Sequence, residues 1–298
     1  MPPEKKFVKI GDPAPDFTLK SLDGVDLRLS NYRGKRVLLF VWASWENCRE
    51  QLPAWQDFYQ RHQGESFELI SIAMDALGPQ VVRPFVEHAG VTFPTVVDSA
   101  DGLWDLYGFE ILPNGYYIDE RGCVRYLKVG GFDVREATTV KILDDLLSEK
   151  WPKIPIKVPD KAKVSTKREI LELARQVRAK PRAIEKRLRL CELLVQMGEY
   201  KKAAKEYDKL LAQHPKQVRA LFGRGVVCHR ERRPQRALEY WRRAYSLDPG
   251  NWIIRKQIWS LEHPEQFYPT VNYGWQQEQI RREELQAMAV EKSRAQAK

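Results

Sequence analysis

The stretch VWASWENCREQLP, residues 41–53, follows the apolar run VLLF and decides the fold of the first half of the chain. An unbroken apolar run from Val37 to Trp42 predicts a strand that is buried on both faces. Ser44 favours the N-terminal cap of a helix, so we expect a helix from there through Gln51 to about Arg61. This strand, turn and helix place Cys48 in the first turns of the helix.

The rest of residues 1–150 predicts strands that alternate with helices. Two short strands flank the Asp23-Gly24 turn, and a closing hairpin turns at residues 120–122. Other strands are expected at 67–75 and in the segment FPTVVD, and other helices at 79–89, 101–107 and 133–149. This order of elements predicts an α/β sandwich for residues 1–150.

A proline-rich and lysine-rich segment, residues 151–166, follows the α/β half. Its prolines stiffen the chain and its lysines keep it solvated, so we expect a linker. Beyond it the patterns are helical only. We therefore expect an all-α domain over residues 167–262, with a first helix at 167–179, and we treat residues 263–298 as an aromatic tail and C-terminal helix.

The helical half contains a repeat with a period of 34 residues. Small, aromatic and proline positions coincide in Gly198, Tyr200, Ala203, Tyr207, Leu210 and Pro215, and again in Arg232, Pro234, Ala237, Trp241, Ala244 and Pro249. In a helical hairpin the alanine lets two helices approach, the aromatic residue fills the groove beside it, and the proline ends the second helix. These segments resemble second helices of tetratricopeptide repeats, and first helices are expected at 183–197 and 217–231. Residues 251–262 begin a third repeat or cap the array.

Two repeats are few for a free-standing solenoid. We therefore expect the array to lean on the N-terminal domain or on another chain. The tail that follows is rich in aromatic residues: Trp252, Trp259, Phe267, Tyr268, Tyr273 and Trp275. We expect it to pack over the repeats, with the binding of a partner as the alternative, and we expect a charged helix over residues 275–298.

Composition and charge narrow the class of protein. A content of 43% hydrophobic and 30% charged residues, without an apolar run long enough for a bilayer or a secretory signal, predicts a soluble cytoplasmic protein that does not enter membranes. Residues 1–150 carry 17 Lys and Arg against 23 Asp and Glu, and residues 151–298 carry 33 against 17. An acidic half joined to a basic half predicts mutual docking or an acidic partner. No base-reading motif is present, so we do not expect nucleic acid to be that partner.

Three segments of the N-terminal half resemble the thioredoxin superfamily, in particular TlpA/ResA-type oxidoreductases and their redoxin and peroxiredoxin relatives. They are GDPAPDFTLKSLDG, VLLFVWASWENCREQLP and YGFEILPNGYYIDERGCV. The resemblance spans roughly residues 8–148. This resemblance implies a thioredoxin-like α/β sandwich. Together with the repeats, it gives an α/β sandwich joined to an all-α tetratricopeptide-repeat domain. The resemblance also implies that Pro113 follows a cis peptide bond and faces the reactive cysteine across a substrate groove.

The resembled turn, of the form WCxxCRxExP, holds two cysteines where this chain holds one. Cys48 is followed by Arg49 and, five residues on, by Pro53, which gives Cys48 the second position. Counted from Trp45, the first position falls on Glu46, and the turn is one residue short. Dithiol exchange needs a second thiol to resolve the mixed disulfide, so Cys48 requires an external thiol reductant.

The other three cysteines, Cys123, Cys191 and Cys228, are interpreted as packed residues, because free cysteine is among the most buried residue types. Cys123 follows the hairpin turn, which in the resembled fold lies at the opposite end of the sheet from the reactive turn. For Cys48, a helix N-terminus and Arg49 favour the thiolate, whereas Glu46 and Glu50 oppose it. The residues alone therefore leave the direction of its pKa shift open. Trp45 and Trp42 are expected to flank the thiol or to belong to the core.

Three hypotheses of function remain. The first is a redox enzyme that uses Cys48 alone, either in thiol-disulfide exchange or as a peroxiredoxin-like peroxidase. A peroxiredoxin signature places Thr or Ser three residues before the cysteine, where this chain has Trp45, which weakens the peroxidase variant. The second is a redox-inactive scaffold that binds a protein or peptide through its repeats, and the third is an adaptor with a regulatory thiol. No metal spacing or cofactor motif is present, and a homodimer is compatible with the exposed sheet edges.

Overall fold

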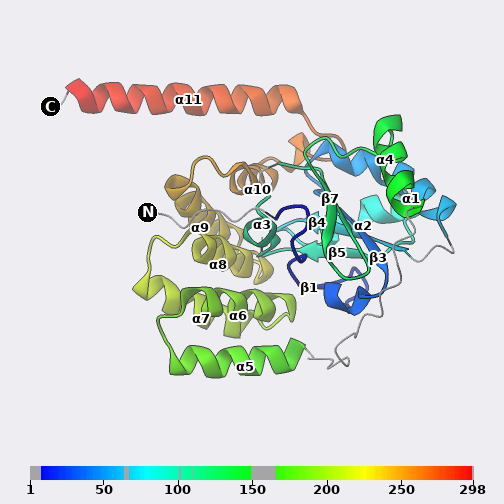
Figure 1. The fold of residues 1–298 in the computed structure, drawn as a ribbon. Coiled ribbons are helices and arrows are strands. Elements are labelled where there is room, and N and C mark those ends of the chain that lie inside the picture. The colour runs from blue at the N-terminus through cyan, green and yellow to red at the C-terminus, as the bar shows by residue number, and fades with distance from the viewer. Residues whose placement is uncertain (1–7, 64–66, 101, 110, 149–165, 297–298) are drawn as a thin grey trace.

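The computed structural model describes residues 8–63, 67–100, 102–109, 111–148 and 166–296 (Figure 1). The N-terminal half forms a five-stranded mixed sheet in the order β5-β4-β3-β6-β7. Its strands are β3 (Arg36–Trp42), β4 (Phe67–Met74), β5 (Thr95–Asp98), β6 (Asn114–Ile118) and β7 (Val124–Val129). A hairpin of β1 (Thr18–Lys20) and β2 (Asp26–Arg28) forms at the predicted turn. The predicted strands are thus confirmed.

Strand β3 lies at the centre of the sheet because its apolar run is covered on both faces. Strand β4 pairs with it in parallel and β6 antiparallel, with Leu38 opposite Tyr117 and Leu39 opposite Tyr116. Since side chains alternate between faces, Leu38 and Tyr117 share one face and Leu39 and Tyr116 the other. All residues from Val37 to Trp42 are buried.

Helices cover both faces of the sheet. On one face, α1 (Leu52–Arg61) packs Trp55 on Phe40, and α4 (Ala137–Ser148) accepts a hydrogen bond from the hydroxyl of Tyr117. On the other face, Tyr107 of α3 (Gly102–Tyr107) packs on Tyr116. Helix α2 (Pro79–His88) packs beside β5. The arrangement is the α/β sandwich that the sequence predicts.

The helical half contains α5 (Thr166–Ala179), α6 (Ile184–Gln196), α7 (Tyr200–Gln213), α8 (Val218–Arg230), α9 (Pro234–Leu247), α10 (Trp252–Glu262) and α11 (Tyr273–Gln296). The repeat positions behave as predicted: Ala203 and Ala237 are buried, and the indole of Trp241 donates to the carbonyl of Phe222 across the α8–α9 hairpin. Most of the predicted linker lies outside the described residues. No helix in the described part of the chain combines the length and the apolar character that crossing a membrane requires.

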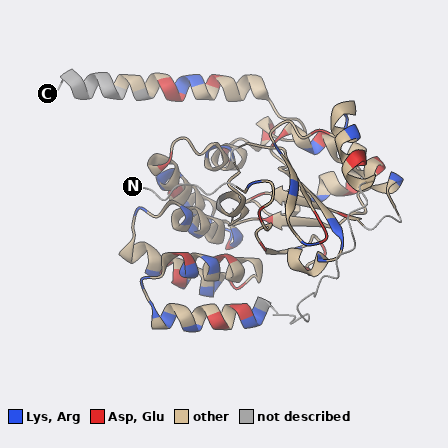
Figure 2. Cartoon of the chain, viewed as in Figure 1, with Lys and Arg blue, Asp and Glu red and all other residues tan. Residues whose placement is uncertain are grey.

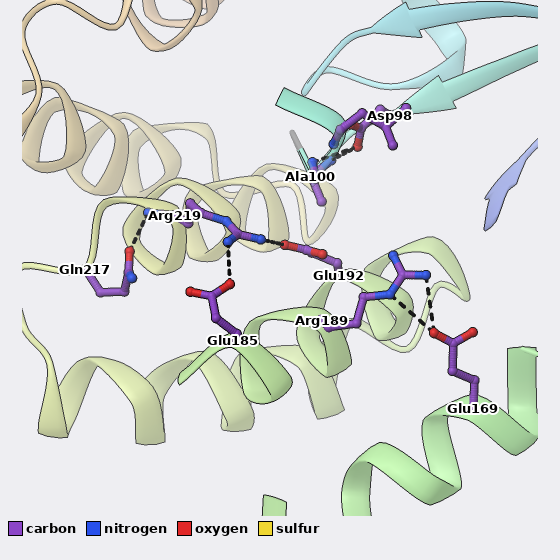
Figure 3. Close-up of polar contacts among 10 residues, drawn as sticks. Asp98, Ala100, Glu169, Glu185, Arg189, Glu192, Gln217 and Arg219 are labelled. Atoms are coloured by element: carbon purple, nitrogen blue, oxygen red, sulfur yellow. Dashed lines mark hydrogen bonds and ion pairs between the residues drawn. The ribbon is translucent and has the colours of Figure 1, made fainter. Parts of the chain in front are cut away.

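The repeats lean on the N-terminal domain, as expected, through the first helix of each pair. On α6, Glu192 lies against Gly102, at the start of α3 and close to Asp98 (Figure 3). On α8, Arg230 donates to the carbonyl of Leu77 and to the hydroxyl of Ser99. Acidic and basic residues are both present along α5 and along α11 (Figure 2).

Candidate functional site

The turn after β3 carries Cys48, but not at the start of an α-helix. Residues Asn47–Gln51 form a 3-10 helix, η2, and α1 begins only at Leu52. The prediction that Ser44 caps this helix is wrong. Its backbone N–H and its hydroxyl both donate to the carboxyl of Asp75, 3.0 and 2.9 Å away, because β4 ends beside β3 and brings Asp75 to the turn.

The Cys48 side chain is buried rather than accessible to solvent. It is 5% exposed. Burial raises the pKa of its thiol to about 12; hydrogen bonds from the backbone at Ala43 and Cys48 oppose this rise, as does the nearby Arg49 charge, whereas Asp75 adds to it. Single-thiol chemistry requires access to the sulfur and a thiolate, so burial and the raised pKa both disfavour reaction of Cys48 in this conformation.

No described cysteine is placed to resolve a disulfide at Cys48. All four cysteines are free, and Cys191 on α6 and Cys228 on α8 are buried. Cys123 follows β6, which runs antiparallel to β3 with Ile118 opposite Val37, so it lies at the opposite end of the seven-residue strand β3. That strand spans about 20 Å, far beyond the Cα separation of roughly 7 Å that a disulfide tolerates. The expected position of Cys123 is confirmed.

Glu46, to which the resemblance assigns the position of the first cysteine, binds the C-terminal region. One carboxylate oxygen forms an ion pair with Lys256 on α10, and the other accepts a hydrogen bond of 2.6 Å from the hydroxyl of Tyr273. The same hydroxyl accepts from the backbone N–H of Asn47 at 3.2 Å. The segment from residue 263 to residue 275, which we call the strap, therefore lies against the reactive turn.

Arg49 is the second point of attachment, and it is almost completely buried. Its guanidinium donates to the carbonyl of Ser44 within the turn, and to those of Phe267 and Pro269 in the strap. It also lies 4.4 Å from the centroid of the Phe85 ring on α2. The sequence suggested that Arg49 stabilises a thiolate, but its guanidinium donates two hydrogen bonds to the strap and two within the turn, to Ser44 and Glu50.

Trp45 belongs to an aromatic cluster that joins the two halves. The residue is fully buried, and its indole donates to the carbonyl of Met74. Trp252 of α10 packs edge-on against Trp45 at 5.4 Å and against Trp104 at 5.9 Å. Of the two roles expected for Trp45, the structure shows the core position.

Pro113 follows a cis peptide bond, as the resemblance implies. The next residue, Asn114, pairs with Val41 near the C-terminal end of β3, so Pro113 lies at the same end of the strands as the Cys48 turn. The predicted site residues thus lie at the same end of the strands, where the strap contacts the turn: Cys48, Trp45, Glu46, Arg49 and Pro113.

Asp75 is a buried carboxyl that the sequence analysis missed. Besides Ser44, its neighbours include Tyr268 of the strap, whose hydroxyl lies 3.0 Å from that of Ser44. Burial raises the pKa of Asp75 to about 7, while the hydrogen bonds from Ser44 oppose the rise. The aromatic content of residues 252–275 was the one sequence signal for this region, and it indicated packing over the repeats rather than against the reactive turn.

The aromatic tail therefore contacts both the repeats and the N-terminal domain, rather than the repeats alone. Trp275 packs against Trp259 on α10 at 5.5 Å, which confirms packing over the repeats. Tyr268 and Tyr273 instead contact the N-terminal domain through Ser44 and Glu46.

Comparison with known proteins agrees with this geometry. Residues 10–127 match the AhpC/TSA family, and residues 188–251 match a tetratricopeptide repeat. The chain is 36% identical over 129 residues to thiol-disulfide oxidoreductase ResA of Geobacillus thermodenitrificans, a match that covers 43% of this chain and 73% of that protein. It is 31% identical over 117 residues to sporulation thiol-disulfide oxidoreductase A of Bacillus subtilis, covering 38% of this chain and 70% of the relative. The crystal structure of StoA from Bacillus subtilis is similar to 42% of this chain and 94% of that chain, with 30% identity and a TM-score of 0.37.

A mixed sheet with a cysteine-bearing turn after its central strand and a cis-proline at the same end of the strands is the arrangement of a thioredoxin-like domain. The chain belongs to the family of ResA-like thiol-disulfide oxidoreductases, and it carries tetratricopeptide repeats after that domain.

Proposed function

We propose that the protein is a single-cysteine thiol-disulfide oxidoreductase, in which Cys48 exchanges with a substrate disulfide and an external thiol completes the cycle. The observation that carries this proposal is the position of Cys48 in the reactive turn, with Glu46 in the place of a partner thiol and Cys123 at the far end of β3.

The exchange has two balanced steps. The Cys48 thiolate attacks one sulfur of a substrate disulfide, so a mixed disulfide forms and the other substrate sulfur leaves as a thiolate. A thiolate of the external reductant then attacks the substrate sulfur of that mixed disulfide, which releases Cys48 and transfers the substrate to a disulfide with the reductant. A monothiol cycle of this kind needs no second cysteine in the protein.

The geometry favours disulfide exchange over peroxide reduction. A peroxidase site needs a hydroxyl beside the cysteine to orient the peroxide. The Ser44 hydroxyl is instead held by Asp75 and faces the Tyr268 hydroxyl. Antioxidant activity and residence in the cytoplasm stay predictions.

A second candidate function is a redox-silent scaffold. One observation favours it: the Cys48 thiol is buried, and burial raises its pKa to about 12. A protein partner would then bind a face of the repeats other than the one turned toward the N-terminal domain, because the first helices α8 and α10 use Arg230 and Lys256 to contact that domain.

Reduction of a peptide–glutathione mixed disulfide by reduced glutathione separates the two candidates. We expect the full chain to accelerate the reaction, Cys48→Ser to abolish the acceleration, and Cys123→Ser to retain it. Equal activity of Cys48→Ser and the unsubstituted chain would refute the proposal. Absence of turnover in all three proteins, and also in a variant whose Cys48 reacts readily with iodoacetamide, would favour the scaffold.

A further inference from the structure

The strap is fixed to the reactive turn at two points, and each point uses a residue that flanks Cys48. We propose that the strap, residues 263–275, is an autoinhibitory cover, and that Cys48 becomes reactive only when this segment leaves the turn. The role of this cover in catalysis rests on the proposed function. Whether the strap covers Cys48 can be tested without any substrate.

The first attachment is made by Arg49. The carbonyl groups of Phe267 and Pro269 accept hydrogen bonds from its guanidinium. The ring centroid of Tyr268, which lies between them in sequence, is 6.1 Å from that of Phe85. Phe267 is fully buried and forms the apolar anchor of the strap. A turn of the strap therefore lies against the guanidinium next to Cys48.

The second attachment is made by Glu46. Its two carboxylate oxygens bind Lys256 of α10 and Tyr273 of the strap, and Asn47 donates to the same tyrosine hydroxyl. Glu46 stands where related turns have their first cysteine. In the register of the resemblance, the residue at the first cysteine position is therefore also the residue that binds the strap.

The strap is built to detach locally. Apart from Phe267, most of its side chains are half-buried or exposed, and its described backbone is not part of a strand. Segments with few buried apolar contacts open at much lower free energy than the global unfolding of a domain. Opening would remove Tyr268 and Tyr273 from the turn while leaving the sheet and α1 in place.

Release of the strap also accounts for a change in chemistry. Burial is the largest cause of the raised Cys48 pKa, so exposure of the turn lowers that pKa toward its ordinary value. Arg49 would then lose its two strap carbonyls and keep its place one residue from the thiol. The opened turn therefore combines access with a nearby cation, the two conditions that activate a cysteine.

The test uses the full chain with the second attachment loosened by Lys256→Met and Tyr273→Phe together. Iodoacetamide labelling of Cys48 at pH 8, followed by peptide mass spectrometry, reports the opening. We expect labelling to accelerate about tenfold or more, since loss of about 1.4 kcal/mol of closing free energy is a tenfold change. The matched control is Lys141→Met with Tyr240→Phe, which removes an exposed ion pair to Asp145 on α4 and a hydroxyl on α9. Unchanged labelling in the strap variant, or equal acceleration in the control, would overturn the proposal.

A second measurement on the unsubstituted chain does not depend on whether the variant folds. The labelling rate of Cys48 is followed at low urea concentrations, below the unfolding transition. We expect a shallow dependence on urea, because local opening exposes little surface. A dependence as steep as that of global unfolding would show that Cys48 is reached only by unfolding and would refute the cover. Faster labelling in the strap variant without any disulfide turnover would support the cover while refuting the proposed function.

Discussion

Unfolding should increase the reactivity of Cys48 far more than that of an ordinary surface thiol. The perturbation is the transfer of the protein from native buffer into urea at pH 8, which exposes every cysteine. In the native protein the thiol is 5% exposed and burial raises its pKa from 9.0 to about 12. The unfolded chain has no such environment, so the pKa returns to the ordinary range.

The magnitude follows from the thiolate fraction. At pH 8 a thiol with a pKa of 9.0 is roughly one-tenth ionised, whereas a thiol with a pKa of about 12 is ionised in about one molecule in ten thousand. Alkylation proceeds through the thiolate, so the native rate at Cys48 should be on the order of a thousandfold below the unfolded rate. Steric covering by the strap lowers it further.

The assay is alkylation by iodoacetamide with the four cysteine peptides resolved by mass spectrometry. Cys123, which is partly exposed, serves as the internal reference. Between pH 7 and pH 10 the native rate at Cys48 should rise about tenfold per pH unit without a plateau. A plateau near pH 9, or a native rate within tenfold of the unfolded rate, would refute the account of a buried, protonated thiol.

Three further predictions concern stability, measured by urea unfolding. Arg49→Met should destabilise the protein by about 3 kcal/mol or more, because carbonyls in the turn and the strap lose their charged donor, and Arg49→Lys should recover only part of this loss. Burial raises the pKa of the Asp75 carboxyl from 3.8 to about 7, so the folded state retains a proton that the unfolded state releases. The free energy of unfolding should therefore fall as pH rises from about 4 to 7. Asp75→Asn should flatten that fall, and a variant with an unchanged pH profile would contradict this prediction. Gly115→Ala should destabilise by about 1–3 kcal/mol, because a Cβ on β6 would lie 2.3 Å from the Phe132 ring, whereas Gly250→Ala, with an open surrounding, should change stability little.

Local patterns predicted the elements of this fold because each pattern reports a local physical constraint. The apolar run of β3 predicted burial on both faces, and the 34-residue period predicted the α6–α7 and α8–α9 hairpins. The start of α1 was misplaced because the Ser44 hydroxyl has two possible partners: as an N-cap it would accept a hydrogen bond from a helix backbone N–H, whereas in this fold it donates one to Asp75. The N-cap preference is local, whereas Asp75 lies on another strand and is brought to Ser44 only by the pairing of β3 with β4.

The site was harder to predict for the same reason. The contacts that decide the chemistry of Cys48 join residues more than 200 positions apart, such as Glu46 with Tyr273 and Arg49 with Phe267. Sequence placed Glu46 in the position of a lost cysteine and Tyr273 in an aromatic tail, but no periodicity links the two segments. The direction of the Cys48 pKa shift depends chiefly on burial of the thiol, which the residues of the turn alone do not reveal.

The opposite net charges of the two halves suggest electrostatic docking, yet the contacts across the interface are of another kind. Lys256 and Glu46 do form an ion pair between the halves. Beside it, the guanidinium groups of Arg49 and Arg230 donate to backbone carbonyls of the opposite half, and Trp252 packs on Trp45. Salt screens exposed charges but has little effect on buried hydrogen bonds and ring packing, so docking of this kind persists at high ionic strength. Buried hydrogen bonds and ring packing therefore hold the two halves together beside the Lys256–Glu46 ion pair.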